Sequence, residues 1–255
     1  MLNSVGNALR VLEHLVERGE SGVSEMARDL DLSPGGVHRI VSTLVEARFA
    51  EQNRDNRKYL PGSRILELAN AMRSQVEFLD LAHGHLERLM QRTQETVNFG
   101  VLRGDEVVYV DRVVSNQPLA VEVKIGSRVP AYCTALGKAL LAHAEPTARD
   151  SYLNRLKDLG QGDGPSVPTR EHLEEDLSRI RVRGTADDPG EFSPDIACVA
   201  APIFNGRDRA VAAVSISGPA SRMRARRDLL EPMVEIAAKE ISLLLKELGE
   251  DSPRL

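Results

Sequence analysis

The stretch that decides the fold is SEMARDLDLSPGGVHRIVSTL, residues 24–44, in which two short helical patterns are separated by a turn. In the second pattern Ser33 precedes Pro34, and a hydroxyl followed by proline is typical of a helix N-terminus. Apolar residues then recur at the spacing of one helix face, at Val37, Ile40, Val41 and Leu44. The stretch therefore predicts two helices joined by a turn, the second with one apolar face.

The remaining face of the second helix is polar. At about 100° per residue, Gly35, His38, Arg39, Ser42 and Thr43 fall opposite the apolar residues. In a helix-turn-helix the second helix lies in the major groove of DNA, with its N-terminal residues toward the bases. Arg39 and His38 are then expected to reach base edges or phosphates, and Ser42 and Thr43 to donate to phosphates. The alternative is an amphipathic helix of a small bundle with a solvated face.

The flanking segments complete a winged helix-turn-helix over residues 1–63. Leu9, Leu12 and Val16 follow helical spacing after Ser4, which we expect to be the N-cap of the first helix, as Ser24 is of the second. The segment FAEQNRDNRKYLPG, residues 49–62, has a turn-forming tip and predicts a hairpin, the wing. The residues predicted to contact DNA are Ser33, Gly35, His38, Arg39, Ser42, Thr43, Arg54, Arg57 and Lys58.

Gly35 and Gly36 are unusual in the first turn of a helix, where each costs about 0.8–1 kcal/mol relative to alanine. They would let the backbone approach a phosphate closely, or they are simply tolerated at a fraying helix end. The sequence leaves both interpretations open.

Charge is distributed unevenly along the chain. The 255 residues carry 33 Lys+Arg and 38 Asp+Glu, a net charge of −5. Residues 1–64 are balanced, with 9 of each sign, so the whole deficit belongs to residues 65–255. Within the first part, residues 33–64 hold six basic and three acidic side chains, a net charge of +3. Such a segment is often only a solvated face, but here it coincides with the predicted reading helix and wing.

The rest of the chain predicts a linker helix and a second domain. Helical spacing over residues 64–93 is interpreted as a linker helix, residues 64–77, followed by the first helix of a domain over residues 78–250. Strands are expected at 97–101 and 106–110 around Gly104-Asp105, at 119–124, and at 196–204 and 210–217 around Asn205-Gly206. Helices are expected near 134–144, 147–157, 170–183 and 226–248, with a loop at 160–168. The fold class is therefore α+β.

Composition excludes several classes of protein. Length suits two domains, and 42% hydrophobic with 28% charged residues argues against extensive disorder. No stretch approaches the roughly 20 apolar residues of a membrane-spanning helix, and Glu13 and Glu17 argue against a signal peptide. Two cysteines, Cys133 and Cys198, are too few for a disulfide scaffold. We expect a cytoplasmic protein that needs no cofactor or metal and does not bind membranes.

Long segments resemble the IclR family of bacterial transcriptional regulators. The segments similar to its DNA-binding domain are SVGNALRVLEHL, SEMARDLDLSPGGVHRIVSTL and NRKYLPG. Those similar to its effector-binding domain are HLERLMQRTQETVNFGVLRGDEVVYVDRV, GSRVPAYCTALGKALLA, DDPGEFSPDIACVAAPIF and AVAAVSISGPASRM. The resemblance implies a GAF-like effector domain with an antiparallel sheet flanked by helices. It also implies a homodimer or homotetramer (a dimer of dimers) on palindromic DNA operators, and repression or activation under a small-molecule effector. The Gly35-Gly36 pair departs from the family, which more often has polar or basic residues there.

A binding site for a small organic acid is expected in the second domain. Thr134 can cap a helix that begins Ala135-Leu136-Gly137, and free N–H groups at a helix N-terminus favour a carboxylate. Ser215 and Ser217 share a strand face, with Cys198 on the preceding strand. The resemblance assigns effector contacts to Ala135, Leu136, Asp188, Ile196, Cys198, Ser215 and Ser217. Taken singly, these hydroxyls, the thiol and the Asp187-Asp188 pair are more often strand hydroxyls, a small core residue and turn formers.

Two other functions stay open from the residues alone. One is a small-molecule enzyme built on the second domain, although no histidine stands in a catalytic string, His83 and His85 point apart on a helix, and no phosphate-binding glycine motif is present. The other is a protein-interaction module whose helix-turn-helix makes only protein contacts. The sequence favours a regulator that is not an enzyme.

Overall fold

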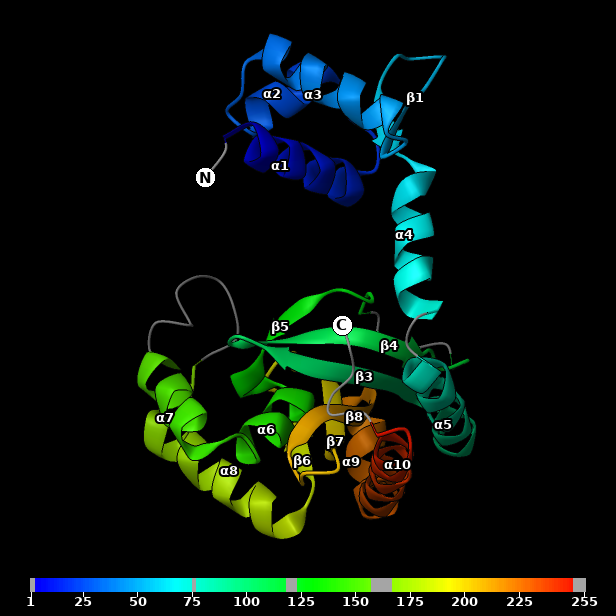
Figure 1. Cartoon of the computed structure of the whole chain (residues 1–255). Coiled ribbons are helices and arrows are strands. Elements are labelled where there is room, and N and C mark those ends of the chain that lie inside the picture. The colour runs from blue at the N-terminus through cyan, green and yellow to red at the C-terminus, as the bar shows by residue number, and fades with distance from the viewer. Residues whose placement is uncertain (1–2, 75–76, 118–122, 157–166, 250–255) are drawn as a thin grey trace. The chain divides into compact units, whose positions relative to one another are not determined.

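The computed structural model describes residues 3–74, 77–117, 123–156 and 167–249 (Figure 1). The chain divides into two compact units, Met1–Gln75 and Val76–Leu255. Each unit has a hydrophobic core of its own.

The first unit is a winged helix-turn-helix. Its helices are α1 (Asn3–Arg18), α2 (Val23–Asp29), α3 (Pro34–Glu46) and α4 (Ser63–Ser74), and the hairpin pairs β1 (Ala50–Gln52) with β2 (Tyr59–Pro61). The core is formed by side chains from α1, α2, α3 and the hairpin, with Leu15, Met26, Val37 and Val41 at 0% exposure. The apolar face predicted for α3 is therefore the face that packs inward.

The helix starts in this unit agree only partly with the prediction. Ser33 is the N-cap of α3, and its side chain accepts a hydrogen bond from the Gly36 amide. Ser4, by contrast, lies inside α1, which already includes Asn3. The cap of α2 is Gly22 rather than Ser24, because the Glu25 side chain reaches back to accept from the Gly22 N–H. The carboxylate at the third helical position thus accepts from the N–H of the N-cap residue, whereas a capping hydroxyl would have accepted from an N–H of the first turn.

The second unit is built on a six-stranded antiparallel sheet in the described residues, ordered β5-β4-β3-β8-β7-β6. Its strands are β3 (Thr96–Arg103), β4 (Glu106–Val113), β5 (Arg128–Pro130), β6 (Ala186–Asp188), β7 (Ile196–Phe204) and β8 (Ala210–Pro219). Both predicted hairpins are present, and their strands match the predicted ranges or extend beyond them. The predicted strand at 119–124 lies mostly outside the described residues, and Val123 and Lys124 are not in a strand.

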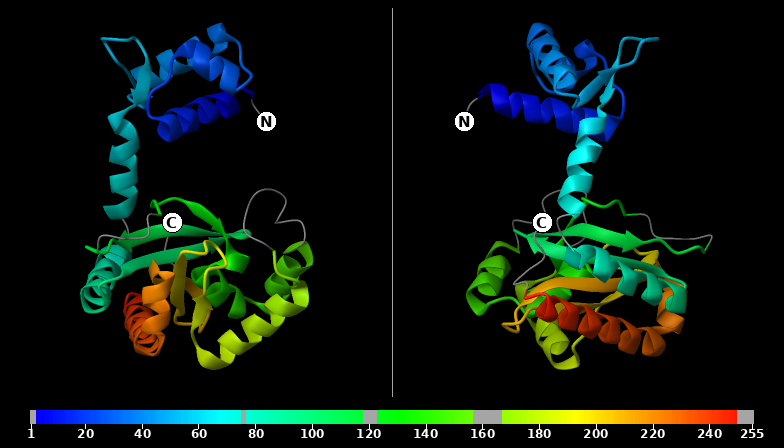
Figure 2. Two further views of the ribbon diagram at one scale, coloured as in Figure 1. Left: turned by 180° about the vertical axis from the view of Figure 1, so that it is seen from behind. Right: turned by 45° about the vertical axis from the view of Figure 1, so that its right-hand side comes forward.

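Helices cover both faces of this sheet (Figure 2). One face packs against α5 (Glu77–Thr93), α9 (Ala220–Ala225) and α10 (Arg227–Glu247). The other packs against a short 3-10 helix (Ala131–Cys133) followed by α6 (Ala135–Ala142), α7 (Pro146–Arg155) and α8 (Arg170–Arg183). Because side chains alternate along β8, Val214 and Ile216 enter the first core, while Ala213, Ser215 and Ser217 face the second helix layer. The α+β class and the flanked antiparallel sheet are confirmed.

Candidate functional site

The polar face of α3 is exposed, as predicted for a reading helix. Five of the predicted residues are exposed, namely Ser33, Gly35, His38, Arg39 and Thr43, and Ser42 is half-buried. The hydroxyl of Ser42 donates to the His38 carbonyl at 2.8 Å, and that of Thr43 donates to the Arg39 carbonyl at 3.1 Å. These two hydroxyl protons are thus directed into the helix and must turn outward to donate to a phosphate.

Asparagine side chains hold the wing in shape. The Asn53 side-chain carbonyl accepts from the Asp55 amide at 3.0 Å, and that of Asn56 accepts from the Lys58 amide at 2.9 Å. The amide groups of the same two asparagines donate to Glu20, at 2.8 and 3.1 Å, and these bonds lower the pKa of Glu20. The turn is therefore ordered by its own side chains and anchored to the segment that follows α1.

The arginines of the basic segment fall into two groups. Arg48 and Arg64 both bind Glu67 in α4, at 3.3 and 2.8 Å. In the part of the chain that the structure describes, the exposed side chains of Arg39, Arg54 and Arg57 make no ion pair. Lys58 lies 3.8 Å from Glu25. The cations available to an outside anion are thus the one on α3 and those at the wing tip.

The residues predicted to bind an effector converge on one cavity of the second unit. Its wall is formed by Tyr109, Val123, Thr134, Ala135, Leu136, Asp188, Phe192, Ile196, Cys198, Ser215 and Ser217. All the predicted effector residues except Gly137 are among them. The cavity volume is about 70 Å³, and since one water needs roughly 10–15 Å³, the space suits a small molecule. Tyr109, Val123 and Phe192 were not predicted.

The N-terminus of α6 forms one wall of this cavity. Thr134 is the N-cap, and its hydroxyl oxygen accepts from the Gly137 amide at 3.2 Å. The preceding N–H groups, of Ala135 and Leu136, have no carbonyl partner within the helix and favour an anion. Gly137 is the predicted effector residue that does not line this cavity: its amide is already bonded to Thr134, and an added Cβ would lie 2.2 Å from the Ala131 carbonyl oxygen. Gly137 instead allows the backbones to pack closely.

The sheet wall of the cavity carries a chain of hydrogen bonds. The Asn98 side-chain amide donates to the Ser217 hydroxyl at 3.0 Å, and this hydroxyl donates to the Cys198 sulfur at 3.2 Å. Burial, with a smaller contribution from Asp188, raises the pKa of the Cys198 thiol to about 12. A thiol with such a pKa stays protonated near neutral pH, which disfavours nucleophilic catalysis by Cys198.

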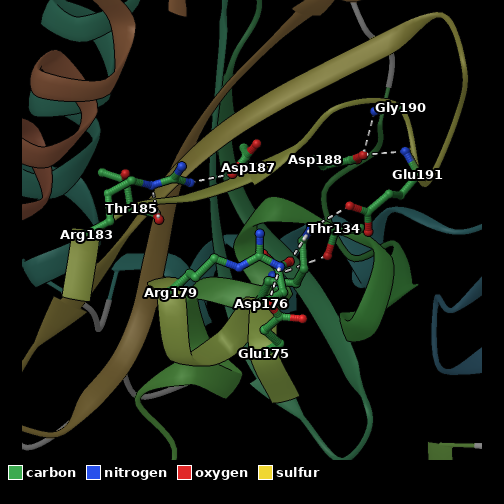
Figure 3. Close-up of polar contacts among 12 residues, drawn as sticks. Thr134, Glu175, Asp176, Arg179, Arg183, Thr185, Asp187, Asp188, Gly190 and Glu191 are labelled. Carbon is green, nitrogen blue, oxygen red and sulfur yellow. Dashed lines mark hydrogen bonds and ion pairs between the residues drawn. The ribbon is translucent and has the colours of Figure 1, made fainter. Parts of the chain in front are cut away.

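Asp187 and Asp188 point to opposite sides of β6 (Figure 3). Asp187 pairs with Arg183 and, at 3.2 Å, with Arg227. Asp188 is 1% exposed, and its carboxylate accepts from the amides of Gly190 and Glu191, at 2.9 and 2.6 Å. Burial raises the pKa of Asp188 even though these N–H groups favour its charged form. Asp188 therefore lines the cavity and also shapes the loop that contributes Phe192.

A buried lysine ties that loop to the helices. Lys138 in α6 is 1% exposed and lies 2.7 Å from Glu191 in the loop and 3.1 Å from Asp176 in α8. Burial acts to lower its pKa, but the two carboxylates outweigh burial and the pKa is raised. Sequence reasoning missed this cluster, although a single lysine within the apolar helix ALGKALLA was an available signal.

Two kinds of feature are absent from the part of the chain that the structure describes. None of the described helices is both long enough and apolar enough to cross a membrane. No group of three His, Cys, Asp or Glu side chains that could hold a metal ion occurs in residues 3–74, 77–117, 123–156 and 167–249.

A winged helix-turn-helix joined in one chain to a domain with a small-molecule cavity defines the class of ligand-responsive DNA-binding proteins. Family models assign the chain more closely. "Bacterial transcriptional regulator IclR C-terminal" matches residues 71–243, and "IclR helix-turn-helix domain" matches residues 4–54. The chain belongs to the IclR family of DNA-binding transcriptional regulators, as the sequence resemblance predicted.

The sequences of individual relatives align with nearly the whole chain. The HTH-type transcriptional regulator BhcR of Paracoccus denitrificans is 33% identical, covering 98% of this chain and 90% of the relative. The transcriptional repressor IclR of Escherichia coli is 30% identical, covering 95% and 89%. Among solved structures, an IclR homologue from Microbacterium hydrocarbonoxydans in complex with 4-hydroxybenzoate matches with a TM-score of 0.79 at 27% identity, covering 95% of this chain and 98% of that one. The first two of these relatives are named as regulators of transcription.

Proposed function

We propose that this regulator binds a palindromic operator as a homodimer or dimer of dimers, and that a small organic acid in the cavity of the second unit controls its DNA affinity. In each protomer α3 enters the major groove and the β1–β2 wing follows the phosphate backbone. The regulator acts in the cytoplasm, where bacterial DNA lies.

The observation that carries the effector proposal is the composition of the cavity wall. Residues far apart in the chain, from Thr134 to Ser217, line one small space that is bounded by a helix N-terminus and by strand hydroxyls. The N–H groups of Ala135 and Leu136 suit a carboxylate. The homologue crystallised with 4-hydroxybenzoate, itself an organic acid, supports this ligand class.

The DNA proposal rests on the exposed basic side chains of α3 and of the wing. Arg39 on the helix and Arg54 and Arg57 on the wing are exposed, whereas Arg48 and Arg64 are occupied by Glu67. Coupling of the two sites requires that the acid bind two conformations with different affinity, because only a differential affinity shifts the equilibrium. Typical coupling corresponds to about a 5–150-fold change in DNA affinity.

A binding titration tests the DNA part. The protein is titrated, at several salt concentrations, against a labelled DNA duplex from the region upstream of its own gene and against a duplex of scrambled sequence. We expect specific, salt-sensitive binding to the first duplex. Equal affinity for both duplexes would contradict operator recognition and favour a protein-interaction role for the helix-turn-helix.

The effector part is tested by a double substitution in the cavity. Ser215→Ala with Ser217→Ala removes two wall hydroxyls, so we expect the double variant to keep operator binding but lose its response to a panel of carboxylates. The matched control is Ser178→Ala in α8, whose hydroxyl bonds to the Glu174 carbonyl outside the cavity. An unchanged response in the double variant would rule out this cavity as the effector site.

A further inference from the structure

The two glycines in the first turn of α3 have ordinary helical backbone. Gly35 and Gly36 directly follow the Ser33 cap and Pro34, and neither has a positive φ. Any L-amino acid adopts such a backbone, so conformational freedom is not the reason for glycine at either position. What a side chain would meet at each position therefore decides why glycine stands there.

At Gly36 the fold itself supplies a reason. An added Cβ would lie 2.9 Å from the Ser33 Oγ, which is the atom that accepts from the Gly36 amide at 3.2 Å and so caps α3. A side chain at this position would crowd the capping hydroxyl. Gly36 thus leaves room for the N-cap.

At Gly35 the described part of the fold supplies no such reason. The residue is exposed, and an added Cβ would meet no atom of the described residues within 4 Å. Glycine in a helix is less stable than alanine because its unfolded chain has more conformational freedom to lose. Glycine at position 35 therefore lowers the stability of the unit without making room for any described neighbour.

A frayed helix end does not account for Gly35, because the first turn of α3 is held on both sides of it. The Ser33 hydroxyl accepts from the Gly36 amide, and the Ser33 carbonyl accepts from the Val37 amide at 3.0 Å. Pro34 fixes the backbone angle at the first helical position. The residue at position 35 is thus part of an ordered turn, and the choice of glycine has a cost there.

The missing side chain lies on the face of α3 that we expect to read DNA. Residues three and four apart are neighbours on a helix surface, so Gly35 shares a face with His38 and Arg39, both of them exposed. The N-terminal residues of a reading helix point toward the bases. The space that Gly35 leaves free is therefore on the side where DNA approaches, one turn before Arg39.

We propose, on the basis of the operator binding proposed above, that Gly35 is a positioning residue for DNA recognition. Its lack of a side chain lets the DNA duplex come into contact with the α3 backbone, and this depth of insertion brings Arg39 within hydrogen-bonding distance of base edges. Hydrogen bonds weaken steeply as distance and angle depart from the optimum. A methyl group at position 35 holds the helix away from the groove floor and weakens the contacts that follow it.

The substitution Gly35→Ala tests this role, because it should change stability and operator affinity in opposite directions. Alanine favours the helix, so we expect the midpoint of chemical denaturation to stay the same or rise. Fluorescence anisotropy should show an affinity for the duplex from upstream of the gene that is about fivefold or more weaker. Affinity for the scrambled duplex should change little, because the charges that attract phosphates are unaltered.

Two further variants complete the test. Gly84→Ala makes the same change in α5 of the second unit, where the new Cβ would meet only the end of the Arg88 side chain, and should leave both DNA affinities unchanged. Gly35→Leu adds a larger side chain from a residue that also favours helices. It should bind the upstream duplex more weakly than Gly35→Ala does.

Four results would overturn the proposal. They are wild-type affinity of Gly35→Ala for the upstream duplex, an equal loss of affinity for both duplexes, a Gly35→Leu protein that binds no more weakly than Gly35→Ala, and a lower denaturation midpoint of Gly35→Ala. The last result would mean that the fold itself requires this glycine.

The wild-type protein separates this inference from the function beneath it. If the wild type prefers the upstream duplex and Gly35→Ala keeps that preference, the role of Gly35 fails and operator binding stands. If the wild type binds both duplexes equally, operator recognition fails and the role of Gly35 fails with it.

Discussion

Three arginines differ from the other two arginines of residues 33–64 in their surroundings. Arg48 and Arg64 share the carboxylate of Glu67, while Arg39, Arg54 and Arg57 are exposed and make no ion pair within the described ranges. An arginine without a competing carboxylate can give its whole fork of donors to a base edge or a phosphate. The sequence predicted all three, because position on α3 and at the hairpin tip follows from periodicity and turn chemistry.

Arg39→Ala should weaken operator binding while leaving the fold intact. Loss of a base-edge contact corresponds to about 1–3 kcal/mol, or roughly 5–150-fold in affinity. Fluorescence anisotropy on the operator duplex measures the effect, and circular dichroism checks the fold. Arg179→Ala in α8, an exposed site in the other unit, carries the same change in charge and serves as the control. Equal operator affinities of the Arg39→Ala and Arg179→Ala variants would contradict a contact between Arg39 and DNA.

Both thiols should react slowly in the native protein. Burial raises the pKa of Cys133 and of Cys198 to about 12, so near pH 8 roughly one thiol in ten thousand is ionised. We expect slow modification by a disulfide reagent at pH 8, faster as pH rises toward 12, and rapid once the protein is unfolded. Because the folded pKa lies above the unfolded value of about 9, the free energy of unfolding should also fall as pH rises above 9. Rapid labelling of native protein at pH 8 would contradict the raised pKa of the two thiols.

At the scale of elements, α6 decides the form of the cavity. It begins at the Thr134 cap, its first residues Ala135 and Leu136 line the cavity, and Gly137 brings the helix against the backbone of the preceding 3-10 helix. Lys138, one residue further, fixes the helix to α8 and to the loop through Asp176 and Glu191. One short helix therefore links the cavity wall to the loop that contributes Phe192.

Gly137→Ala should lower the free energy of unfolding by about 1–3 kcal/mol, because the new methyl group meets backbone atoms that cannot rotate away. Gly84→Ala in α5 is the matched helical control, since its Cβ would meet only the end of the Arg88 side chain, at 3.6 Å. Chemical denaturation compares the two variants. A Gly137→Ala protein as stable as wild type would mean that the backbones can separate at little cost.

Sequence patterns predicted the elements that carry a period or a turn signal. The helices around Ser33 and Thr134, both hairpins, and the shared face of Ser215 and Ser217 agree with the structure because capping, turn chemistry and alternation are local. The short strand β5, the helix α9 and the cap of α2 were missed, since pairing across the sheet or a side chain reaching backward decides them. Tyr109 and Phe192 were likewise not predicted, because only the sheet register and the loop bring them to the cavity.

At the scale of the whole molecule, the net charge of −5 combines two different contributions. Residues 1–64 are neutral overall, with +3 over residues 33–64, and the remainder carries the full deficit. An acidic second unit disfavours non-specific association with polyanions, while the basic segment attracts a correctly placed phosphate backbone. Symmetric assembly would repeat that basic segment once for each protomer.

The salt dependence of operator binding should report this assembly. Each phosphate contact contributes about −0.9 to the slope of the logarithm of affinity against the logarithm of salt concentration. Arg54→Ala should therefore make the slope shallower by about 0.9 in a monomer and by about 1.8 in a homodimer. Arg179→Ala should leave it unchanged. An unchanged slope in the Arg54→Ala variant would contradict a contact between the wing and the DNA backbone.

The polar row on the sheet has a consequence for how such a sensor changes over evolutionary time. This row consists of Thr96 in β3, Ser217 in β8, Cys198 in β7 and Asp188 in β6, which occupy paired positions on four successive strands. The strands are held by main-chain hydrogen bonds, which do not depend on side-chain identity. Exchange of one member of the row can therefore alter chemical preference while the scaffold and the DNA-reading unit stay as they are. A duplicated copy of this gene could acquire a new small-molecule effector through a few point mutations on one sheet face.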